Sequence, residues 1–171
     1  MQAVSSIGDV LGSAGEPPII VWRGKEYKVA YPTLATLDRM EKLIARRAMN
    51  ELKELQGAIP DDQYAVLTDQ IQSLIVARHY RVGGQLWAKM VSGPEGILLY
   101  LQSYLQEHQP TISEDDIKQM SSEEPRQVQA AIAMVTPHFL ALAGVRAGRT
   151  PEEIQAIIEN WRQKAGLVPS S

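Results

Sequence analysis

Most of the chain carries apolar residues at the three- and four-residue spacing of amphipathic helices. The longest such stripe follows Thr33 and continues to Gly57, with apolar residues at Leu37, Met40, Ile44, Ala48, Leu52 and Leu55. Thr33 can cap this helix, because its hydroxyl can accept a hydrogen bond from a free N–H group of the first turn. A second stripe begins at Pro60-Asp61 and ends before Gly83-Gly84, with apolar residues at Tyr64, Leu67, Ile71, Leu74 and Ile75. The pattern predicts two long consecutive helices.

Proline, glycine and short polar residues divide the second half of the chain into further helices. A short helix is expected around Leu86, Trp87 and Met90. Residues 92–95 (SGPE) then start a helix that contains the run ILLYLQSYLQEH and ends at Pro110. Residues 122–125 and 150–153 again look like helix starts, and Gly166 like the last helix stop. Pro137 is expected to kink or divide the helix that starts near residue 125.

A β-hairpin is predicted ahead of these helices, because two β-rich runs, PIIVW and YKVAY, flank a turn that contains Gly24. Residues 1–17 before it are rich in glycine and small residues and cannot pack by themselves. The predicted fold is mainly α, a multi-helix single domain with a short N-terminal β-hairpin. Its parts are a flexible arm at 1–17, the hairpin at 18–31, the helical domain at 32–165 and a tail at 166–171.

The stretch QEHQPTISEDDI, Gln106–Ile117, gathers a histidine and three carboxylates around a proline. It lacks the alternating acids, the glycine and the final glutamate of a calcium loop. An acid–base pair of His108 and Glu114 would need a substrate pocket, of which the sequence gives no sign. Capping by Thr111 or Ser113, with the acids in the first turn of the next helix, accounts for every residue. We therefore expect a structural corner.

No other constellation of residues indicates a reaction. The chain has no GxSxG elbow, no phosphate-binding glycine loop, no HExxH motif and no cysteine. Its three histidines lie far apart and none has a second ligand at helical spacing. We predict that the protein is not an enzyme and has no catalytic residue, no cofactor and no metal site.

Charge and hydropathy narrow the classes of partner. A formal net charge of −3 gives no broad basic surface for phosphate backbones, so nucleic-acid binding is disfavoured. The longest apolar stretch, Ala130–Val145, is shorter than the roughly 20 residues of a membrane span and contains Pro137 and His138. The N-terminus has neither the basic start nor the apolar block of a signal peptide. No membrane role is expected.

Two stretches together resemble the phage tail assembly chaperones. Gly24–Leu43, GKEYKVAYPTLATLDRMEKL, is similar to their short hairpin leading into a helix with regularly spaced leucines. Leu98–Met120, LLYLQSYLQEHQPTISEDDIKQM, is similar to their apolar helix, polar break and Thr/Ser-capped acidic helix. The glycine-rich arm and the extra helix ending at Trp161 depart from that pattern.

The resemblance implies a non-enzymatic bacteriophage morphogenesis protein that binds other phage assembly or virion proteins in the host cytoplasm. It leaves self-association into a homo-oligomer open. The first alternative is a permanent virion structural protein of the tail, neck or head, because the terminal extensions suit a subunit that threads onto its neighbours. A further alternative is a helical DNA-binding or packaging protein, which the acidic helix start PEEIQ at residues 151–155 weakens.

A surplus of apolar residues suggests where a partner binds. In ILLYLQSYL, residues Ile97, Leu98, Leu101 and Leu105 can share a stripe toward the core, which leaves Leu99 and Tyr100 pointing elsewhere. Ile20 and Trp22 lie in a hairpin whose edges leave backbone groups open to pairing. We predict partner binding through Ile20, Trp22, Leu99 and Tyr100. The alternative is that neighbouring helices of the same chain cover all four.

Overall fold

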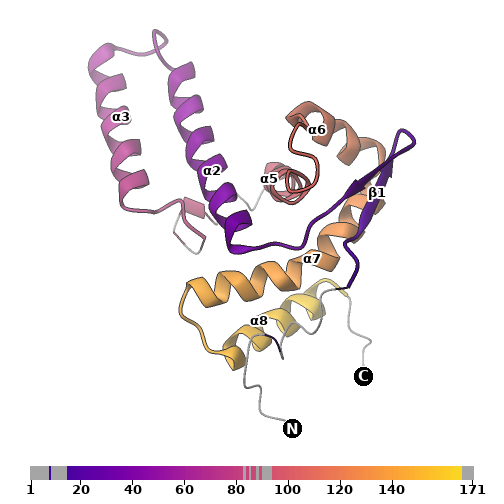
Figure 1. Cartoon of the computed structure of the whole chain (residues 1–171). Helices are drawn as coiled ribbons and strands as arrows, with labels where there is room; N and C mark the ends of the chain where they lie inside the picture. The colour runs from indigo at the N-terminus through magenta and orange to yellow at the C-terminus, as the bar shows by residue number, and fades with distance from the viewer. Residues whose placement is uncertain are drawn as a thin grey trace.

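The computed structural model describes residues 8, 15–82, 84, 86, 87, 89 and 94–166, and over these residues the fold is mainly α, as predicted. Here an antiparallel hairpin of β1 (Ile19–Trp22) and β2 (Lys25–Lys28) precedes six helices (Figure 1). The helices are α2 (Leu34–Glu54), α3 (Asp61–Val76), α5 (Pro94–Leu105), α6 (Glu114–Glu123), α7 (Pro125–Arg146) and α8 (Pro151–Lys164). Most of the predicted arm and tail, and Met90 of the predicted short helix, lie outside the described residues.

The hairpin turns at Arg23-Gly24. Both residues have a positive φ, 51° for Arg23 and 74° for Gly24, which suits a two-residue turn between twisted strands. Because side chains alternate along a strand, this register places Ile20 and Trp22 on one face, where both are buried. The hairpin therefore packs one face on the helices and leaves the other at the surface.

Helix α5 lies at the centre of the main hydrophobic core, between α2, α6 and α7. It contributes Leu101, Tyr104 and Leu105, which are at most 1% exposed. The other buried members of this core come from the hairpin and its exit, α6 and α7: Ile20, Trp22, Val29, Ile117, Met120, Val128, Ala131 and Val135. One expectation for α5 is wrong, because Ile97 is 43% exposed. It lies in the first turn of the helix, at the margin of the packed surface.

Most helices start where the sequence predicts, α3 and α5 included. Capping boxes form at Thr33, Ser113 and Thr150, as expected. The start predicted at residues 122–125 differs, because Ser122 lies inside α6 and the N-cap residue of α7 is Glu124, without a side-chain hydrogen bond. Only Glu124 separates the two helices, which leaves no room for a serine-capped turn.

Helix α7 continues through Pro137 over all 22 of its residues. Figure 1 shows it bent near its middle but not divided, so the first of the two expectations for Pro137 is met. Helix α8 folds back along the second half of α7, where Ile154 and Ile158 pack with Ala141. Gly144 makes this approach possible, since a Cβ there would lie 2.5 Å from Cγ1 of Ile154.

Helices α2 and α3 form a pair that projects from the other helices (Figure 1). The connection between them turns at Gly57, whose φ of 81° favours glycine. Helix α3 ends at Val76, earlier than the expected stop at Gly83-Gly84, and the chain turns next at Arg78, which has a φ of 61°.

Candidate functional site

The candidate site is a pair of helices that we call the arm from here on: α2, α3 and the connection between them, residues 34–76. It is distinct from the N-terminal arm predicted at residues 1–17. One face of α2 packs on α5. By contrast, α3 packs on α2 and has no comparably extensive contact with another described element. Figure 1 shows the tip of the arm well away from α6, α7 and α8. Helix α3 and the tip of the arm are therefore left largely uncovered by the described part of the chain.

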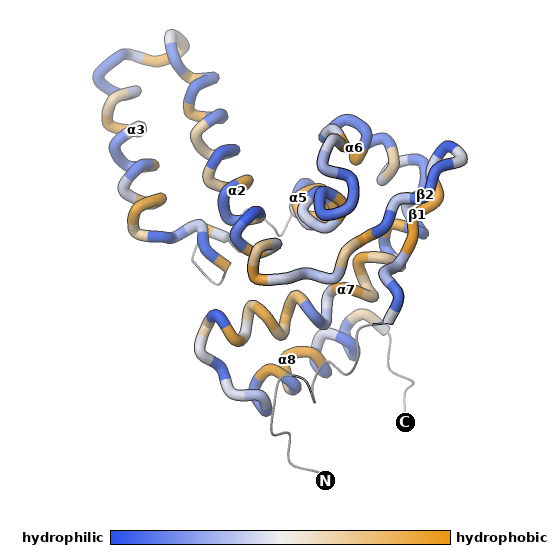
Figure 2. Tube along the Cα trace, viewed as in Figure 1, coloured by the Kyte–Doolittle hydropathy of each residue, from blue (hydrophilic) through white to orange (hydrophobic). Residues whose placement is uncertain are grey.

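Helix α3 has no buried residue. Its apolar residues on the side of α2 are only half-buried: Tyr64, Leu67, Ile71, Leu74 and Ile75. On the outward side, Val66 is 57% exposed and Val76 is 82% exposed. Figure 2 shows hydrophobic positions recurring along both helices of the arm. Because an amphipathic helix is stabilised by burying its apolar face, the half-buried stripe of α3 leaves apolar surface that a partner could cover.

A groove lies between the two helices of the arm. Its lining residues are mostly apolar: Ala48, Glu51, Leu52, Leu55, Leu67, Ile71 and Tyr80. Burial, and then the charge of Glu51, raise the pKa of the Tyr80 phenol, so its hydroxyl stays protonated at neutral pH. The groove therefore suits an apolar side chain with a hydrogen-bond acceptor nearby.

Charged residues fix the base of the arm to the rest of the molecule. Glu41 of α2, whose side chain is 14% exposed, accepts hydrogen bonds from Arg146 Nη1 at 2.8 Å and from the N–H of Val82 at 2.9 Å. Arg81 Nε lies 3.9 Å from the same carboxylate. Arg146 also donates to Asp38, and this hydrogen bond is the main cause that raises the pKa of the Arg146 guanidinium. The arm is anchored at its base and free at its tip.

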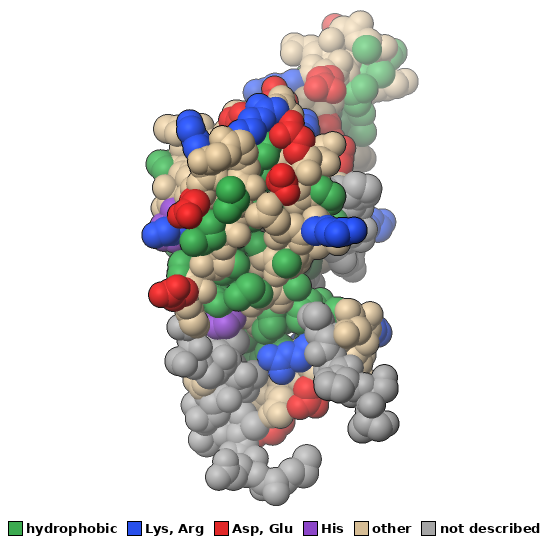
Figure 3. Space-filling view, turned by 90° about the vertical axis from the view of Figure 1, so that its right-hand side faces the viewer, with side chains coloured by type: hydrophobic (Ala, Val, Ile, Leu, Met, Phe, Trp, Pro, Cys, Tyr) green, Lys and Arg blue, Asp and Glu red, His purple; other side chains and the backbone are tan. Residues whose placement is uncertain are grey.

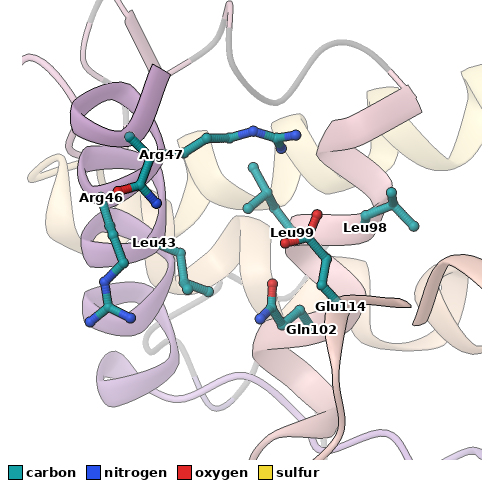
Figure 4. Close-up of a pocket in the computed structure, with 8 residues that line it drawn as sticks. Leu43, Arg46, Arg47, Leu98, Leu99, Gln102 and Glu114 are labelled. Carbon is teal, nitrogen blue, oxygen red and sulfur yellow. The ribbon is translucent and has the colours of Figure 1, made fainter. Parts of the chain in front are cut away.

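A pocket of about 200 Å³ lies where α2 meets α5 and the start of α6 (Figure 4). Its lining residues are Leu43, Arg46, Arg47, Asn50, Leu98, Leu99, Gln102 and Glu114. Arg47 is held by Glu95 at 2.8 Å, and the Glu114 carboxylate is held by Lys118 at 2.9 Å. These lining residues place no nucleophile beside a base, so the pocket offers no arrangement for acyl or proton transfer.

The four residues predicted to bind a partner are covered by the chain itself. Ile20 is 0% exposed and Trp22 is 4% exposed, both in the core with α5, α6 and α7. Leu99 is 6% exposed and packs against α2. Tyr100 is half-buried, with its ring 5.1 Å from the ring of Phe139. This arrangement matches the alternative, in which neighbouring helices cover all four. Binding through them stays a prediction that requires their exposure.

The hairpin edges are less open than the sequence indicated. The side-chain amide of Gln127 accepts from the N–H of Val21 at 2.9 Å and donates to the carbonyl of Val21 at 3.2 Å. On the other edge, the amide of Gln109, oriented to satisfy both of its groups, meets the N–H and carbonyl of Lys28 at 3.1 and 3.2 Å. The expectation of open edges is therefore wrong at Val21 and Lys28, because two glutamine side chains replace a third strand there.

Further polar contacts hold the hairpin against α6. Arg23 Nη2 and Trp22 Nε1 each donate to the carboxylate of Glu123 at 2.6 Å, and these hydrogen bonds lower the pKa of Glu123. The outer face of the hairpin stays at the surface, with Ile19 44% exposed and Val21 47% exposed. Figure 3 shows hydrophobic side chains on this side of the molecule interrupted by charged ones. Scattered apolar residues of this kind are ordinary on protein surfaces.

The acidic corner at Gln106–Ile117 is a helix start, as predicted. The hydroxyl of Ser113 accepts from the N–H of Asp116 at 3.0 Å and donates to the Asp116 carboxylate at 2.6 Å. The hydrogen bonds from Ser113 lower the pKa of Asp116. His108 is exposed and forms no ion pair with Glu114 within the described part of the chain. Over the described residues, no three His, Asp or Glu side chains are grouped so that they could hold a metal ion.

Helix α7 is long and apolar enough to cross a membrane by length and composition alone. A core helix of a soluble protein meets the same criteria. Here α7 packs against α8, α6 and β1. The expectation of no membrane role therefore stays a prediction.

The outward face of α3 is the part of the site that the sequence reasoning missed. Its residues are spaced at i, i+4, i+7, i+11 and i+14 and are all exposed: Asp62, Val66, Asp69, Ser73 and Val76. Val66 and Val76 do not belong to the apolar stripe of this helix. Single apolar residues on a polar face are ordinary, so this pattern by itself does not identify a contact surface.

The arm is thus an anchored pair of helices with apolar residues on two open sides and no grouping of catalytic side chains among its described residues. Comparisons with protein-family models, with curated proteins and with solved structures find no match to this chain. The resemblance to tail assembly chaperones therefore stays a prediction.

Proposed function

We propose that this chain is a non-enzymatic protein of bacteriophage morphogenesis that acts through protein–protein contacts made by the arm. The observation that carries the proposal is α3, a helix of 16 residues with no buried residue and with Val66 and Val76 largely exposed. A surface of this kind is stabilised when a partner helix or groove covers it. The phage setting rests on the resemblance of Gly24–Leu43 and Leu98–Met120 to the tail assembly chaperones.

The chemistry of the described residues supports contact rather than catalysis. The pocket at α2 and α5 and the groove of the arm both lack a nucleophile paired with a base. In the acidic corner, Asp116 takes part in the capping box of α6 and Glu114 pairs with Lys118. The arm instead presents exposed apolar residues next to charged ones, a surface that is open to contact with another protein.

Deletion of the coding sequence from its source genome tests the assembly role. A tail assembly chaperone should be required for tailed particles, so the deletion should leave heads without tails in electron micrographs of lysates. The protein should also be absent from purified particles by mass spectrometry. A protein found in every particle would instead favour the alternative of a virion structural subunit. A source that makes no phage-like particle would refute the proposal.

Substitutions on the arm test where the contact lies. Val66→Gln with Val76→Gln removes exposed apolar surface without opening a core cavity, so the fold should be unchanged. This double variant should fail to restore tailed particles to the deletion strain. Val145→Gln on α7 is the matched control, because Val145 is also exposed, at 44%, but lies outside the arm. Full restoration by the double variant would show that the outward face of α3 is not used.

A further inference from the structure

The outward face of α3 carries an acidic stripe, which we define as Asp62, Val66 and Asp69. All three side chains are exposed, and α3 contains no basic residue between Asp61 and Val76. Neither carboxylate of the stripe forms an ion pair within the described part of the chain. The charges of the stripe are therefore uncompensated within these residues.

An exposed face of α2 carries the opposite charge. We define this basic stripe as Arg46, Met49 and Lys53, of which the two cations are exposed and the methionine is half-buried. Arg46 and Lys53 also form no ion pair with described residues, whereas the neighbouring Arg47 is held by Glu51 and Glu95. The positive charges of the basic stripe, like the negative charges of the acidic stripe, therefore have no ion-pair partner among the described residues.

The two stripes match in spacing. Each places two like charges seven residues apart, about 10 Å along a helix, with an apolar residue between them. With the two helices antiparallel, Asp62 meets Lys53, Asp69 meets Arg46 and Val66 meets Met49, because the spacing is four then three residues in one stripe and three then four in the other. With the helices parallel, the charges still meet but the two apolar residues are offset by one position. We propose that the acidic stripe of one copy of this chain docks on the basic stripe of a second copy. This inference rests on the proposed use of the arm as a contact surface and names a partner for it.

The orientation of the stripes decides the kind of assembly. The acidic stripe lies on the side of α3 opposite to α2, so α2 of the same chain cannot reach it. On α2, the grooves beside Lys42 and Arg46 open toward α3 and α5 respectively, and the basic stripe lies between them. A contact that joins two different patches is heterologous and repeats from copy to copy. Self-docking would therefore form rings or filaments rather than a closed pair.

A contact of a few helical turns is small, so association is weak and depends on salt. We expect the purified chain to exceed its monomer mass of 19.0 kDa in sedimentation equilibrium as the concentration rises. The midpoint should fall at about 10–1000 μM, which corresponds to a modest binding free energy. Raising the salt from about 0.05 M to about 0.5 M should reverse the association, because exposed ion pairs are screened.

Charge exchange between the stripes is the decisive experiment. The variant Asp62→Lys with Asp69→Lys should be monomeric, and so should the variant Arg46→Glu with Lys53→Glu. An equimolar mixture of the two should associate again, since the lysines of one variant then face the glutamates of the other. Circular dichroism confirms that each variant keeps its helices. If either double variant unfolds, the single substitutions Asp69→Lys and Arg46→Glu provide the same test.

Two controls carry single charge reversals outside the arm, equal in size to the single substitutions and half as large as the double variants. Arg126→Glu on α7 and Glu159→Lys on α8 are both at exposed positions and should leave association unchanged. A wild-type chain that stays monomeric at about 1 mM would overturn the inference, because association weaker than that is negligible. So would double variants that associate like the wild type, or a mixture that stays monomeric. None of these results would affect the deletion test of the assembly role, so the two proposals can fail separately.

Discussion

At the base of the arm, Glu41 is nearly buried and is the shared acceptor for Arg146, Arg81 and the N–H of Val82. Glu41→Gln keeps the shape but removes the charge, so two guanidinium groups lose their common partner. We expect the free energy of unfolding to fall by about 1–3 kcal/mol in urea titrations, because a buried charged hydrogen bond is lost. Glu54→Gln is the control: Glu54 is exposed at the end of α2, and its replacement should change stability by less than about 0.5 kcal/mol. Equal effects of the two substitutions would contradict the anchoring role of Glu41.

We expect His138 in α7 to make the stability of the protein depend on pH below about 6.5, the ordinary pKa of imidazole. Both ring nitrogens are buried without a hydrogen bond to described residues, and the ring lies 4.5 Å from that of Tyr31. Burial lowers the pKa of His138, so the unfolded chain binds a proton that the folded chain does not. The contribution of His138 to the free energy of unfolding is therefore fully present above about pH 6.5, the pKa of histidine in the unfolded chain. It decreases as the pH falls below that value.

Melting temperatures at pH 7.5 and 5.5 test this direction. The wild type should lose more stability than His138→Phe, which keeps an aromatic ring beside Tyr31 but cannot be protonated. His108→Gln should behave like the wild type, because His108 is exposed.

The lowered pKa values of Asp116 and Glu123 affect stability only in more acidic solution, since carboxylates titrate near pH 4. Identical pH dependence of wild type and His138→Phe would refute the assignment.

At the scale of elements, two serines in similar sequence contexts differ in their role, because only one of them caps a helix. Ser113 caps α6, whereas Ser122, in a similar sequence context, lies inside α6 and is exposed. Ser113→Ala should lower the free energy of unfolding by about 0.5–2 kcal/mol, because two hydrogen bonds at the helix start are lost. Ser122→Ala should be neutral or slightly stabilising, since alanine favours a helix interior. Urea unfolding of the two variants decides this, and a larger loss at Ser122 would mean that α7 starts earlier than the structure shows.

The same two serines show which elements the sequence could predict. Helix caps and apolar stripes depend on residues within a few positions of each other, so α2, α6 and α8 were expected at nearly their observed starts. The blocked hairpin edges depend on Gln109 and Gln127, which lie far from Val21 and Lys28 in sequence. No local pattern reports such a contact, because an exposed glutamine and one that pairs with a strand edge look alike in sequence. The edge prediction therefore failed where the fold brings distant segments together.

For the whole molecule, apolar pattern alone did not separate a core helix from a contact surface. Leu99 and Tyr100 were expected outside the core because they leave the main stripe of α5, yet α2 and α7 cover them. Helix α3 has a regular apolar stripe, and yet α2 and the segment around Tyr80 cover it only in part, so that none of its residues is buried. Which stripe is covered depends on how many neighbours each helix has, and that number is a property of the whole fold. The candidate site could therefore be found only after the helices were placed.

Helix α3 should open more easily than the rest of the molecule, and native-state hydrogen exchange can measure this. Segments with few buried apolar contacts exchange through local opening, well below the free energy of global unfolding. Amides of α3 should therefore exchange at low urea, whereas those of α5 should need nearly complete unfolding, because Leu101 and Leu105 lie in the main core. Helix α8 is the matched comparison, since it also lies at the periphery but buries Ile154 and Ile158.

Protection in α8 should fall between that of α3 and that of α5. If α3 were as protected as α8 in dilute monomer, the arm would be stable by itself and would need no partner to cover it. If instead the protection of α3 rises with protein concentration while that of α8 stays constant, a second copy is completing the arm. The rise in α3 protection with concentration should be absent in the variant Asp62→Lys with Asp69→Lys. That variant keeps the apolar residues of α3 but reverses the charges through which α3 would dock on a second copy.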